Sequence, residues 1–123
     1  MKKTALLFFL AIFITACSSN APISPQSSNS EAKIVDGMQA ITLSWGKFNY
    51  EPATMKFKLG VPARIYGDLT RLQGCFRSFE IPELGVSTVF SQRKNYVDFM
   101  PDQEGRFTFA CSMGMGSGTI IVE

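Results

Sequence analysis

The stretch Phe107-Thr108-Phe109-Ala110-Cys111-Ser112-Met113-Gly114-Met115-Gly116-Ser117-Gly118 leads into Thr119-Ile120-Ile121-Val122 near the C-terminus. Before Cys111, aromatic and small residues alternate, a period of two that is typical of a half-buried β-strand. From Cys111 onward, sulfur side chains stand at positions 111, 113 and 115 between small residues. If this part of the chain is extended, the three sulfur atoms point to one side. The stretch therefore predicts a metal-binding loop beside a strand.

The same alternation recurs through most of the chain. Ile41, Leu43 and Trp45 alternate with small or polar residues, and a similar pattern covers residues 55–59. Further strands are expected at residues 61–66, 78–81, 86–90, 96–100, 106–110 and 119–122, separated by Gly, Pro and Asp at turns. Residues 101–104 are expected to form one helical turn at most. About seven or eight short strands without a helical period predict an all-β sandwich or barrel.

Bulky apolar residues on or beside these segments form the predicted core. Methionine fills irregular gaps in such cores, so the strand methionines are included. The expected core members are Phe48, Tyr50, Met55, Met100, Phe107 and Phe109. Phe76, next to Cys75, is instead a candidate to shield a bound metal ion from water.

The N-terminus has the pattern of an export signal. Lys2 and Lys3 precede an apolar run, too short for the roughly 20 residues of a membrane-spanning helix, that ends at Ile14-Thr15-Ala16-Cys17. These last residues resemble the bacterial lipoprotein signal, in which the cysteine is lipidated; an ordinary signal peptide is the alternative. We therefore expect a signal peptide at 1–16, lipidated Cys17 with a Ser-, Asn- and Pro-rich disordered tether at 17–33, and a folded domain at 34–123.

The charge and composition of the folded part exclude several classes of function. The whole chain is +2, but residues 34–123 carry nine basic and nine acidic residues. A neutral domain gives no basis for nucleic-acid binding, and no dense basic cluster suggests anionic lipid. With no histidine in the chain, neither a catalytic triad nor a paired-carboxylate motif is found, so we expect no enzyme.

Apart from Cys17, the chain has two cysteines, Cys75 and Cys111. Both are expected in loops at strand ends. In an exported protein this pair could form a disulfide, and that interpretation stays open. Met113 and Met115 favour a metal site instead, because thiolates with thioethers are soft donors that select Cu(I). Structural zinc, blue copper and iron–sulfur sites all require histidine or more cysteine than the chain provides.

Four segments carry a resemblance to a known family. They are 48–52 (FNYEP), 59–65 (LGVPARI), 74–85 (GCFRSFEIPELG) and 105–115 (GRFTFACSMGM). Together they resemble the cupredoxin-like domains of bacterial copper-handling proteins, membrane-anchored Cu(I) chaperones among them. The resemblance implies a cupredoxin-like Greek-key β-sandwich that binds one or two Cu(I) ions and passes copper to a copper-exporting P-type ATPase. By position, Cys75, Cys111 and Met113 would hold the tighter ion, and Met113 and Met115 a weaker second one.

The N-terminal segment differs from the membrane-anchored members of this family, because we expect a lipid anchor here where they have a transmembrane anchor. We therefore expect a monomeric, lipid-anchored, extracytoplasmic envelope protein that captures, buffers or hands off Cu(I), with the ATPase or another envelope copper protein as partner. The alternative is a structural or interaction lipoprotein stapled by a Cys75–Cys111 disulfide and without metal. A redox enzyme or electron carrier is disfavoured by the missing histidines.

Overall fold

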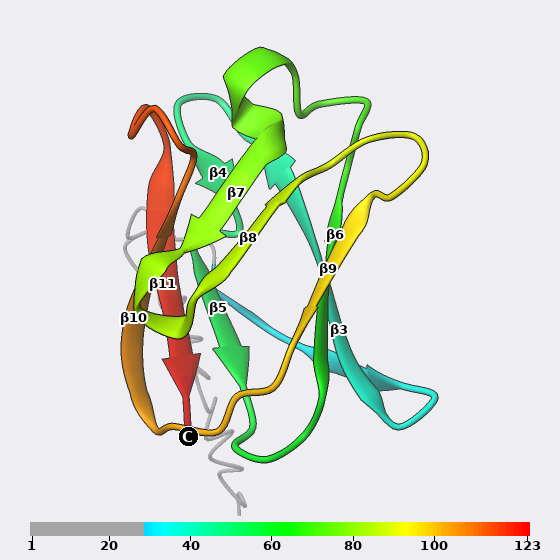
Figure 1. Cartoon of the computed structure of the whole chain (residues 1–123), viewed down its shortest axis with the longest axis vertical. Coiled ribbons are helices and arrows are strands. Elements are labelled where there is room, and N and C mark those ends of the chain that lie inside the picture. Colours follow the sequence, from blue (N-terminus) through cyan, green and yellow to red (C-terminus); the bar gives the residue numbers. More distant parts are fainter. Residues whose placement is uncertain (1–28) are drawn as a thin grey trace, which may run out of the picture.

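Two β-sheets face each other in the computed structural model, which describes residues 29–123 (Figure 1). Helix in this part of the chain is limited to two short 3₁₀ segments. The elements are β1 (Asn29–Glu31), β2 (Lys33–Val35), β3 (Met38–Trp45), β4 (Tyr50–Glu51), β5 (Thr54–Phe57), β6 (Ala63–Gly67), η1 (Gly74–Arg77), β7 (Ser78–Ile81), η2 (Pro82–Leu84), β8 (Val86–Val89), β9 (Tyr96–Phe99), β10 (Gly105–Ala110) and β11 (Ser117–Val122).

One sheet has the order β1-β5-β11-β10-β7-β8, and the other has β2-β3-β6-β9 with β4 paired to β3. The strands that flank the sulfur-rich stretch, β10 and β11, are antiparallel neighbours with Phe107 opposite Ile120. The predicted all-β sandwich is confirmed. The sheets contain more strands than the seven or eight expected, because β1, β2 and β4 have only two or three residues each. Segments that short are too brief to establish a period of two.

The core lies between the two sheets and consists of the apolar members of each alternating strand. Leu43 and Ile65 enter it from one sheet, and Met55 and Phe109 from the other, all at 0% exposure. Phe79 packs against Phe109, with ring centroids 5.5 Å apart. Full burial of such a side chain contributes about 1.5–3 kcal/mol before the entropy cost of ordering the chain. The core therefore provides the rigid frame on which the loops are held.

Two predicted core residues are on the surface, and one predicted helical turn is absent. Phe48 is 82% exposed and Met100 is 51% exposed. Phe48 falls in the tight turn between β3 and β4, and Met100 follows Phe99, whose side chain takes the inward position. Residues 101–104 form an irregular connection between β9 and β10. The helical turns occur instead at η1 and η2, where strand patterning gave no sign of them.

Strand pairing begins at Asn29, ahead of the expected domain start at residue 34, since β1 pairs in parallel with β5. The predicted signal peptide, Cys17 and the tether up to residue 28 lie outside the described residues. Among residues 29–123 there is no helix with the length and apolar character needed to cross a membrane.

The strand directions bring four connections together at one end of the sandwich. β3 and β6 are parallel and finish at this end, whereas β9 and β11 start there (Figure 1). The connections, with the short strand β4 and the first residue of β11, comprise residues 46–51, 68–77, 90–95 and 111–117, and we call them the sulfur end. The far end comprises residues 36–37, 58–62, 82–85, 100–106 and Glu123.

Candidate metal centre

Cys111 directly follows β10 and begins a tight turn. Its N–H donates to the carbonyl of Gly116 at 3.1 Å, and its carbonyl accepts from the N–H of Gly114 at 2.9 Å. Gly114 has φ +68°, a left-handed conformation that glycine adopts without strain. The extended arrangement considered for residues 111–115 is therefore wrong. The chain folds back on itself, which places several backbone N–H groups around the sulfur of Cys111.

Cys75 reaches the same place from η1, which precedes β7. Its Sγ lies 3.8 Å from the Sδ of Met115. The backbone N–H of Met115 in turn lies 3.2 Å from the Sγ of Cys111. Met115 is thus the residue that contacts both cysteines, while Met113 projects from the turn with 70% of its surface exposed. Cys75 and Met115 therefore meet at the sulfur end although they are 40 positions apart in the sequence.

The two cysteines are free thiols in different environments. Cys111 is 1% exposed, and Cys75 is half-buried. Burial acts to raise the pKa of Cys111, but backbone N–H groups of Gly116, Met115, Met113 and Gly114 outweigh it and lower that pKa below its usual value. The turn therefore stabilises a thiolate at Cys111, the form in which cysteine binds metal ions.

A serine hydroxyl connects the two cysteine-bearing segments. Ser78 donates from Oγ to the carbonyl of Cys75 at 2.6 Å. The same oxygen accepts from the N–H of Ser112 at 3.0 Å, and the Ser112 hydroxyl lies 2.9 Å from it. Sequence reasoning missed Ser78, because a serine three positions after a cysteine has no distinguishing signal in a single sequence.

Three aromatic residues form a wall beside the sulfur atoms. Trp45 stacks on Phe76 with centroids 3.7 Å apart, and Tyr50 meets Trp45 edge-on at 5.3 Å. The Tyr50 hydroxyl lies 2.9 Å from the carbonyl of Phe76 and 3.2 Å from that of Ser78. Burial, followed by the proximity of Cys111 and Cys75, raises the pKa of Tyr50 above its usual range. Tyr50 therefore stays a neutral donor that fixes η1, in a wall of low polarity.

The turn is also anchored from the β3–β4 connection. Asn49 donates from Nδ2 to the carbonyl of Ser117 at 2.8 Å, and its Oδ1 accepts from the Ser117 N–H at 3.0 Å. The ring of Trp45 lies directly against Gly116, where an added Cβ would stand 2.6 Å from Cζ3. These contacts explain why the turn needs a glycine at position 116. The role of Asn49 depends on strand pairing, so sequence periodicity could not identify it.

The donors brought together here fit a soft metal ion. Two thiols and a thioether meet at the sulfur end, and a second thioether, Met113, lies in the same turn. Such a set suits Cu(I), whereas harder cations prefer oxygen ligands. In the part of the chain that the structure describes, no three side chains of His, Cys, Asp or Glu gather into a possible metal site.

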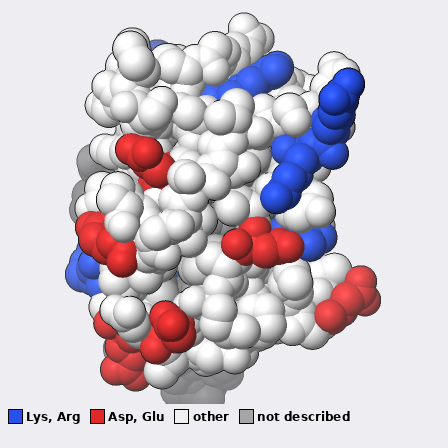
Figure 2. Space-filling view, in the orientation of Figure 1, with Lys and Arg blue, Asp and Glu red and all other residues white. Residues whose placement is uncertain are grey.

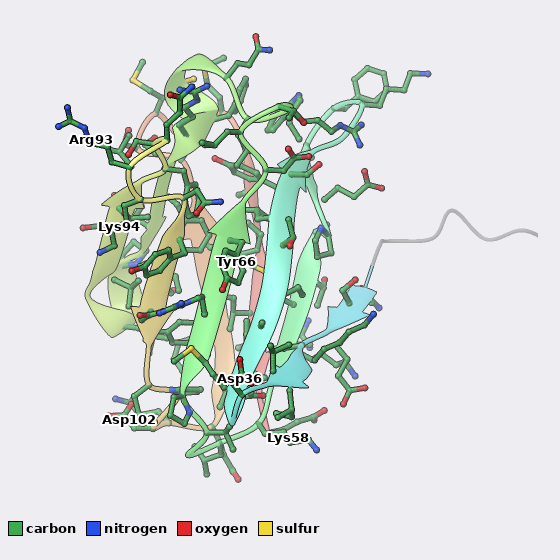
Figure 3. The ribbon with its side chains drawn as sticks, turned by 90° about the vertical axis from the view of Figure 1, so that its right-hand side faces the viewer. Asp36, Lys58, Tyr66, Arg93, Lys94 and Asp102 are labelled. Atoms are coloured by element: carbon green, nitrogen blue, oxygen red, sulfur yellow. The ribbon has the colours of Figure 1, made fainter. Side chains whose placement is uncertain are left out.

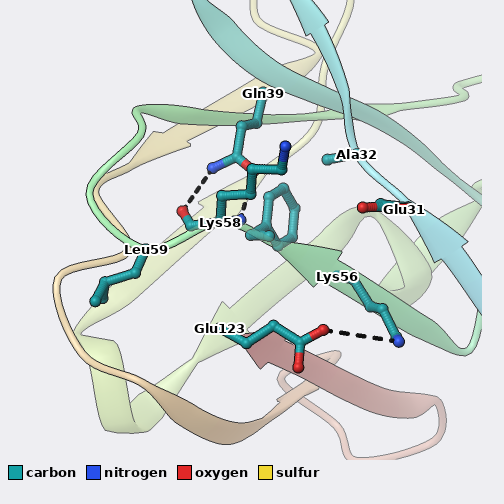
Figure 4. A pocket seen from close by; sticks show the side chains of 8 residues that line it. Glu31, Ala32, Gln39, Lys56, Lys58, Leu59 and Glu123 are labelled. Carbon is teal, nitrogen blue, oxygen red and sulfur yellow. Dashed lines mark hydrogen bonds and ion pairs between the residues drawn. The ribbon is translucent and has the colours of Figure 1, made fainter.

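A separate hollow at the far end offers no comparable chemistry (Figure 4). The side chain of Gln39, 1% exposed, lies at its base. The Gln39 amide donates to the carbonyls of Lys58 and Val61, both at 2.9 Å, and accepts from the Lys58 N–H at 2.6 Å. This amide is therefore used within the fold, where it ties β3 to the β5–β6 connection.

Comparison with known proteins gives a consistent result. A family model described as a cupredoxin-like domain matches residues 6–122. No curated protein matches the chain. A solved metal-binding domain of the Cu(I)-exporting P-type ATPase CopA from Streptococcus pneumoniae D39, determined with Cu(I), is 25% identical. It aligns over 79% of this chain and 97% of its own, with a TM-score of 0.67.

Two further solved structures extend the comparison. A copper binding protein in its apo form, solved by NMR, is 31% identical over 79% of this chain and 99% of its own, with a TM-score of 0.67. A reduced Cu(I) form of an amicyanin mutant is 18% identical over 80% of this chain and 95% of its own, with a TM-score of 0.53. At that identity the amicyanin likeness shows the fold alone.

Proposed function

The chain belongs to the cupredoxin-like domain family, and on this basis we propose that it captures, buffers or hands off Cu(I) at the cell envelope, using Cys75, Cys111, Met113 and Met115. The observation that carries the proposal is the position of Met115. Its sulfur lies 3.8 Å from the Cys75 sulfur, and its N–H lies 3.2 Å from the Cys111 sulfur. The sulfur atoms of both cysteines therefore lie against Met115, that of Cys75 against its thioether and that of Cys111 against its backbone N–H.

Copper enters the proposal through the chemistry of these donors. Thiolate and thioether sulfur bind Cu(I) more strongly than hard cations. The two similar structures at 25% and 31% identity are described as a metal-binding domain solved with Cu(I) and as a copper binding protein. The absence of histidine from the chain distinguishes this donor set from the imidazole-containing sites that stabilise Cu(II).

The different exposures of the ligands suggest a path for the ion. Met113 and Met115 are 70% and 63% exposed, whereas Cys111 is 1% exposed. A copper ion would first meet the thioethers at the surface and then the cysteines beneath them, and it would leave in the reverse order. The stacked rings of Trp45 and Phe76 would shield one side of the ion from water. Such stepwise ligand exchange suits a carrier, and we propose no enzymatic reaction for this site.

The place in the cell is part of the same proposal. A leader that ends in Ile14-Thr15-Ala16-Cys17 supports export and lipidation at Cys17. A monomer tethered outside the cytoplasm would exchange copper with a copper-exporting P-type ATPase or with another envelope copper protein. Metabolic labelling with a fatty acid tests the anchor: the label is expected on the protein and lost in Cys17→Ser. Equal labelling of both forms would contradict it.

An anaerobic competition titration against a Cu(I) chelator tests the function. The reduced protein is expected to take up copper stoichiometrically, and Cys111→Ser or Cys75→Ser should weaken binding by orders of magnitude. Met100→Ala is a matched control, because Met100 is an exposed methionine at the far end. If Cys111→Ser bound copper as tightly as the wild type, the proposal would fail. A thiol count on protein from the envelope separates the disulfide-stapled alternative, which predicts that no free pair is found.

The two methionines make different predictions about the number of ions. The family resemblance assigns Met113 to the cysteine-bound ion and Met115 to a second, weaker one. The Cys75–Met115 contact of 3.8 Å favours Met115 as the partner of the cysteines. In the first arrangement, Met115→Ala removes only the second ion. In the arrangement that the contact favours, Met115→Ala weakens the first ion and Met113→Ala leaves its affinity nearly unchanged.

A further inference from the structure

The charged residues of the domain are separated between its two ends. The sulfur end carries five basic residues and two acidic ones, namely Lys47, Arg71, Arg77, Arg93 and Lys94 against Glu51 and Asp68. The far end has the opposite balance, with Asp36, Glu83, Asp102, Glu104 and Glu123 against Lys58 and Arg106. A domain that is neutral as a whole is therefore a dipole along its long direction.

The pictures show this separation directly. On the face seen in Figure 2, most Lys and Arg side chains lie in the upper part, toward the sulfur end, and most Asp and Glu side chains lie lower. In Figure 3, Arg93 lies near the upper end of the sandwich and Lys94 below it in the upper half, whereas Asp36, Asp102 and the basic Lys58 lie toward the lower end. The arrangement arises because the connections at each end, not the strands, carry most of these charges.

The sulfur end also carries large apolar side chains that are exposed. Phe48, Met113 and Met115 are 82%, 70% and 63% exposed. Phe48 lies in the same turn as Asn49, whose amide is bonded to Ser117 at the end of the turn formed by residues 111–117, which we call the Cys–Met turn. The Nζ of Lys47 lies 5.3 Å from the centre of the Phe48 ring. Exposed aromatic and methionine side chains beside polar and charged ones are common on surfaces that bind another protein.

The positive charge of this end is available to a partner. Lys47, Arg71, Arg93 and Lys94 are all exposed. Of the two acidic residues, Asp68 accepts hydrogen bonds from the backbone N–H and hydroxyl of Thr70, which keep its carboxylate ionised, so five positive charges stand against two negative ones at this end. The field at the sulfur end should therefore attract negatively charged molecules and orient them toward the exposed methionines.

We propose that the sulfur end docks a copper-binding protein domain whose own metal site is ringed by Asp and Glu side chains. The proposal rests on the Cu(I) function above and names the kind of partner. Opposite charges would hold the two sites face to face while Met113 and Met115 exchange the ion. The far end, with its negative charge, would turn away from such a partner, so that only productive encounters are favoured.

The test uses two synthetic Cu(I)-loaded peptides with the same Met-Gly-Met donors, flanked by Glu in one and by Lys in the other. Transfer to the reduced apoprotein is followed anaerobically by stopped flow. Trp45, the single tryptophan of the chain and a neighbour of Gly116, provides the fluorescence signal. At low ionic strength, transfer from the Glu peptide is expected to be about tenfold faster, and added salt should reduce the difference.

Two charge-reversed variants with the same net charge localise the effect. Lys47→Glu with Arg93→Glu changes the sulfur end and should abolish or invert the preference for the Glu peptide. Lys58→Glu with Arg106→Glu changes the far end and should leave most of the preference for the Glu peptide. Equal rates from both peptides into the wild type, or loss of the preference in both variants, would overturn the docking proposal.

The remaining outcomes are also decisive. If the protein takes Cu(I) from neither peptide, the proposed function fails, and the docking proposal fails with it. If the peptides donate at equal rates and the apoprotein binds vesicles of phosphatidylglycerol through Lys47 and Arg93, the basic end serves a membrane surface instead. Faster transfer from the Glu peptide, lost only in the sulfur-end variant, supports an acidic protein partner.

Discussion

The hydroxyl groups of Ser78 and Ser112 lie 2.9 Å apart, and this contact joins the two chain segments that carry the cysteines. Ser78 belongs to β7 and bonds back to the carbonyl of Cys75, while Ser112 follows Cys111. The separation of the two thiols is therefore controlled by a hydrogen-bonded bridge outside the ligand set. Interactions of this kind commonly tune metal affinity without touching the ion.

Ser78→Ala should weaken Cu(I) binding by about tenfold, because loss of the bridge leaves η1 and the Cys–Met turn free to separate. The cost in folding stability should be small, about 1 kcal/mol for the lost hydrogen bonds. Chelator competition and urea unfolding measure the two effects. Ser87→Ala, on the exposed side of β8, is the control. Unchanged affinity in Ser78→Ala would show that the bridge does not position the ligands.

Asn49→Ala should loosen the Cys–Met turn from the β3–β4 connection. Two hydrogen bonds to Ser117, of 2.8 Å and 3.0 Å, are lost together. We expect a destabilisation of about 1–2 kcal/mol and faster amide hydrogen exchange at residues 114–117. Hydrogen exchange followed by NMR checks this, with Asn95→Ala as the control at the same end. Unaltered exchange at residues 114–117 would contradict the anchoring role.

Gly116→Ala should displace the aromatic wall. The new Cβ would stand 2.6 Å from Cζ3 of Trp45, so that ring or the turn must move. Overpacking of this kind costs about 1–3 kcal/mol. The emission of Trp45 should shift with it, and Cu(I) affinity should fall. Ser117→Ala is the control: it removes a hydroxyl at the adjacent exposed position, adds no new Cβ and should leave the emission unchanged. A wild-type spectrum for Gly116→Ala would contradict this packing.

Stability at acid pH should depend on Asp98. Arg64 holds both oxygens of this carboxylate, at 2.6 Å and 2.8 Å, and lowers the pKa of Asp98. The native pKa lies below the unfolded value, about 3.9, so the stabilisation is fully present above that value. It is lost as pH falls through the native pKa. Asp98→Asn should therefore be slightly less stable than wild type at neutral pH, and the difference should shrink with acidification.

Thermal unfolding across pH measures the Asp98 effect. The pair is partly exposed, with side-chain exposures of 26% for Arg64 and 46% for Asp98, so the difference should be modest. Glu104→Gln, at an exposed position of the far end, serves as the control. If Asp98→Asn remained less stable than the wild type at pH values below the native pKa of Asp98, the loss of stability would come from packing and not from charge.

Local periodicity was enough to predict most of the strands. It did not predict the conformation of the loops. Residues 78–81 were predicted as a strand and form β7 with the same bounds, because each inward residue there is apolar. Phe48 was placed in the core by its side chain alone, although its position in a tight turn exposes it. Met115 was chosen for its sulfur, but its contact with Cys75 depends on how η1 packs against the β10–β11 turn, which no local pattern encodes.

Copper K-edge X-ray absorption on the reduced, Cu(I)-loaded protein identifies the atoms that bind the ion. We expect a first coordination shell of sulfur alone, with three donors per ion and fewer sulfur neighbours in Cys75→Ser and Cys111→Ser. A first shell of nitrogen or oxygen in the wild type, or a sulfur shell unaltered in both cysteine variants, would contradict a copper site built from Cys75, Cys111 and the neighbouring methionines.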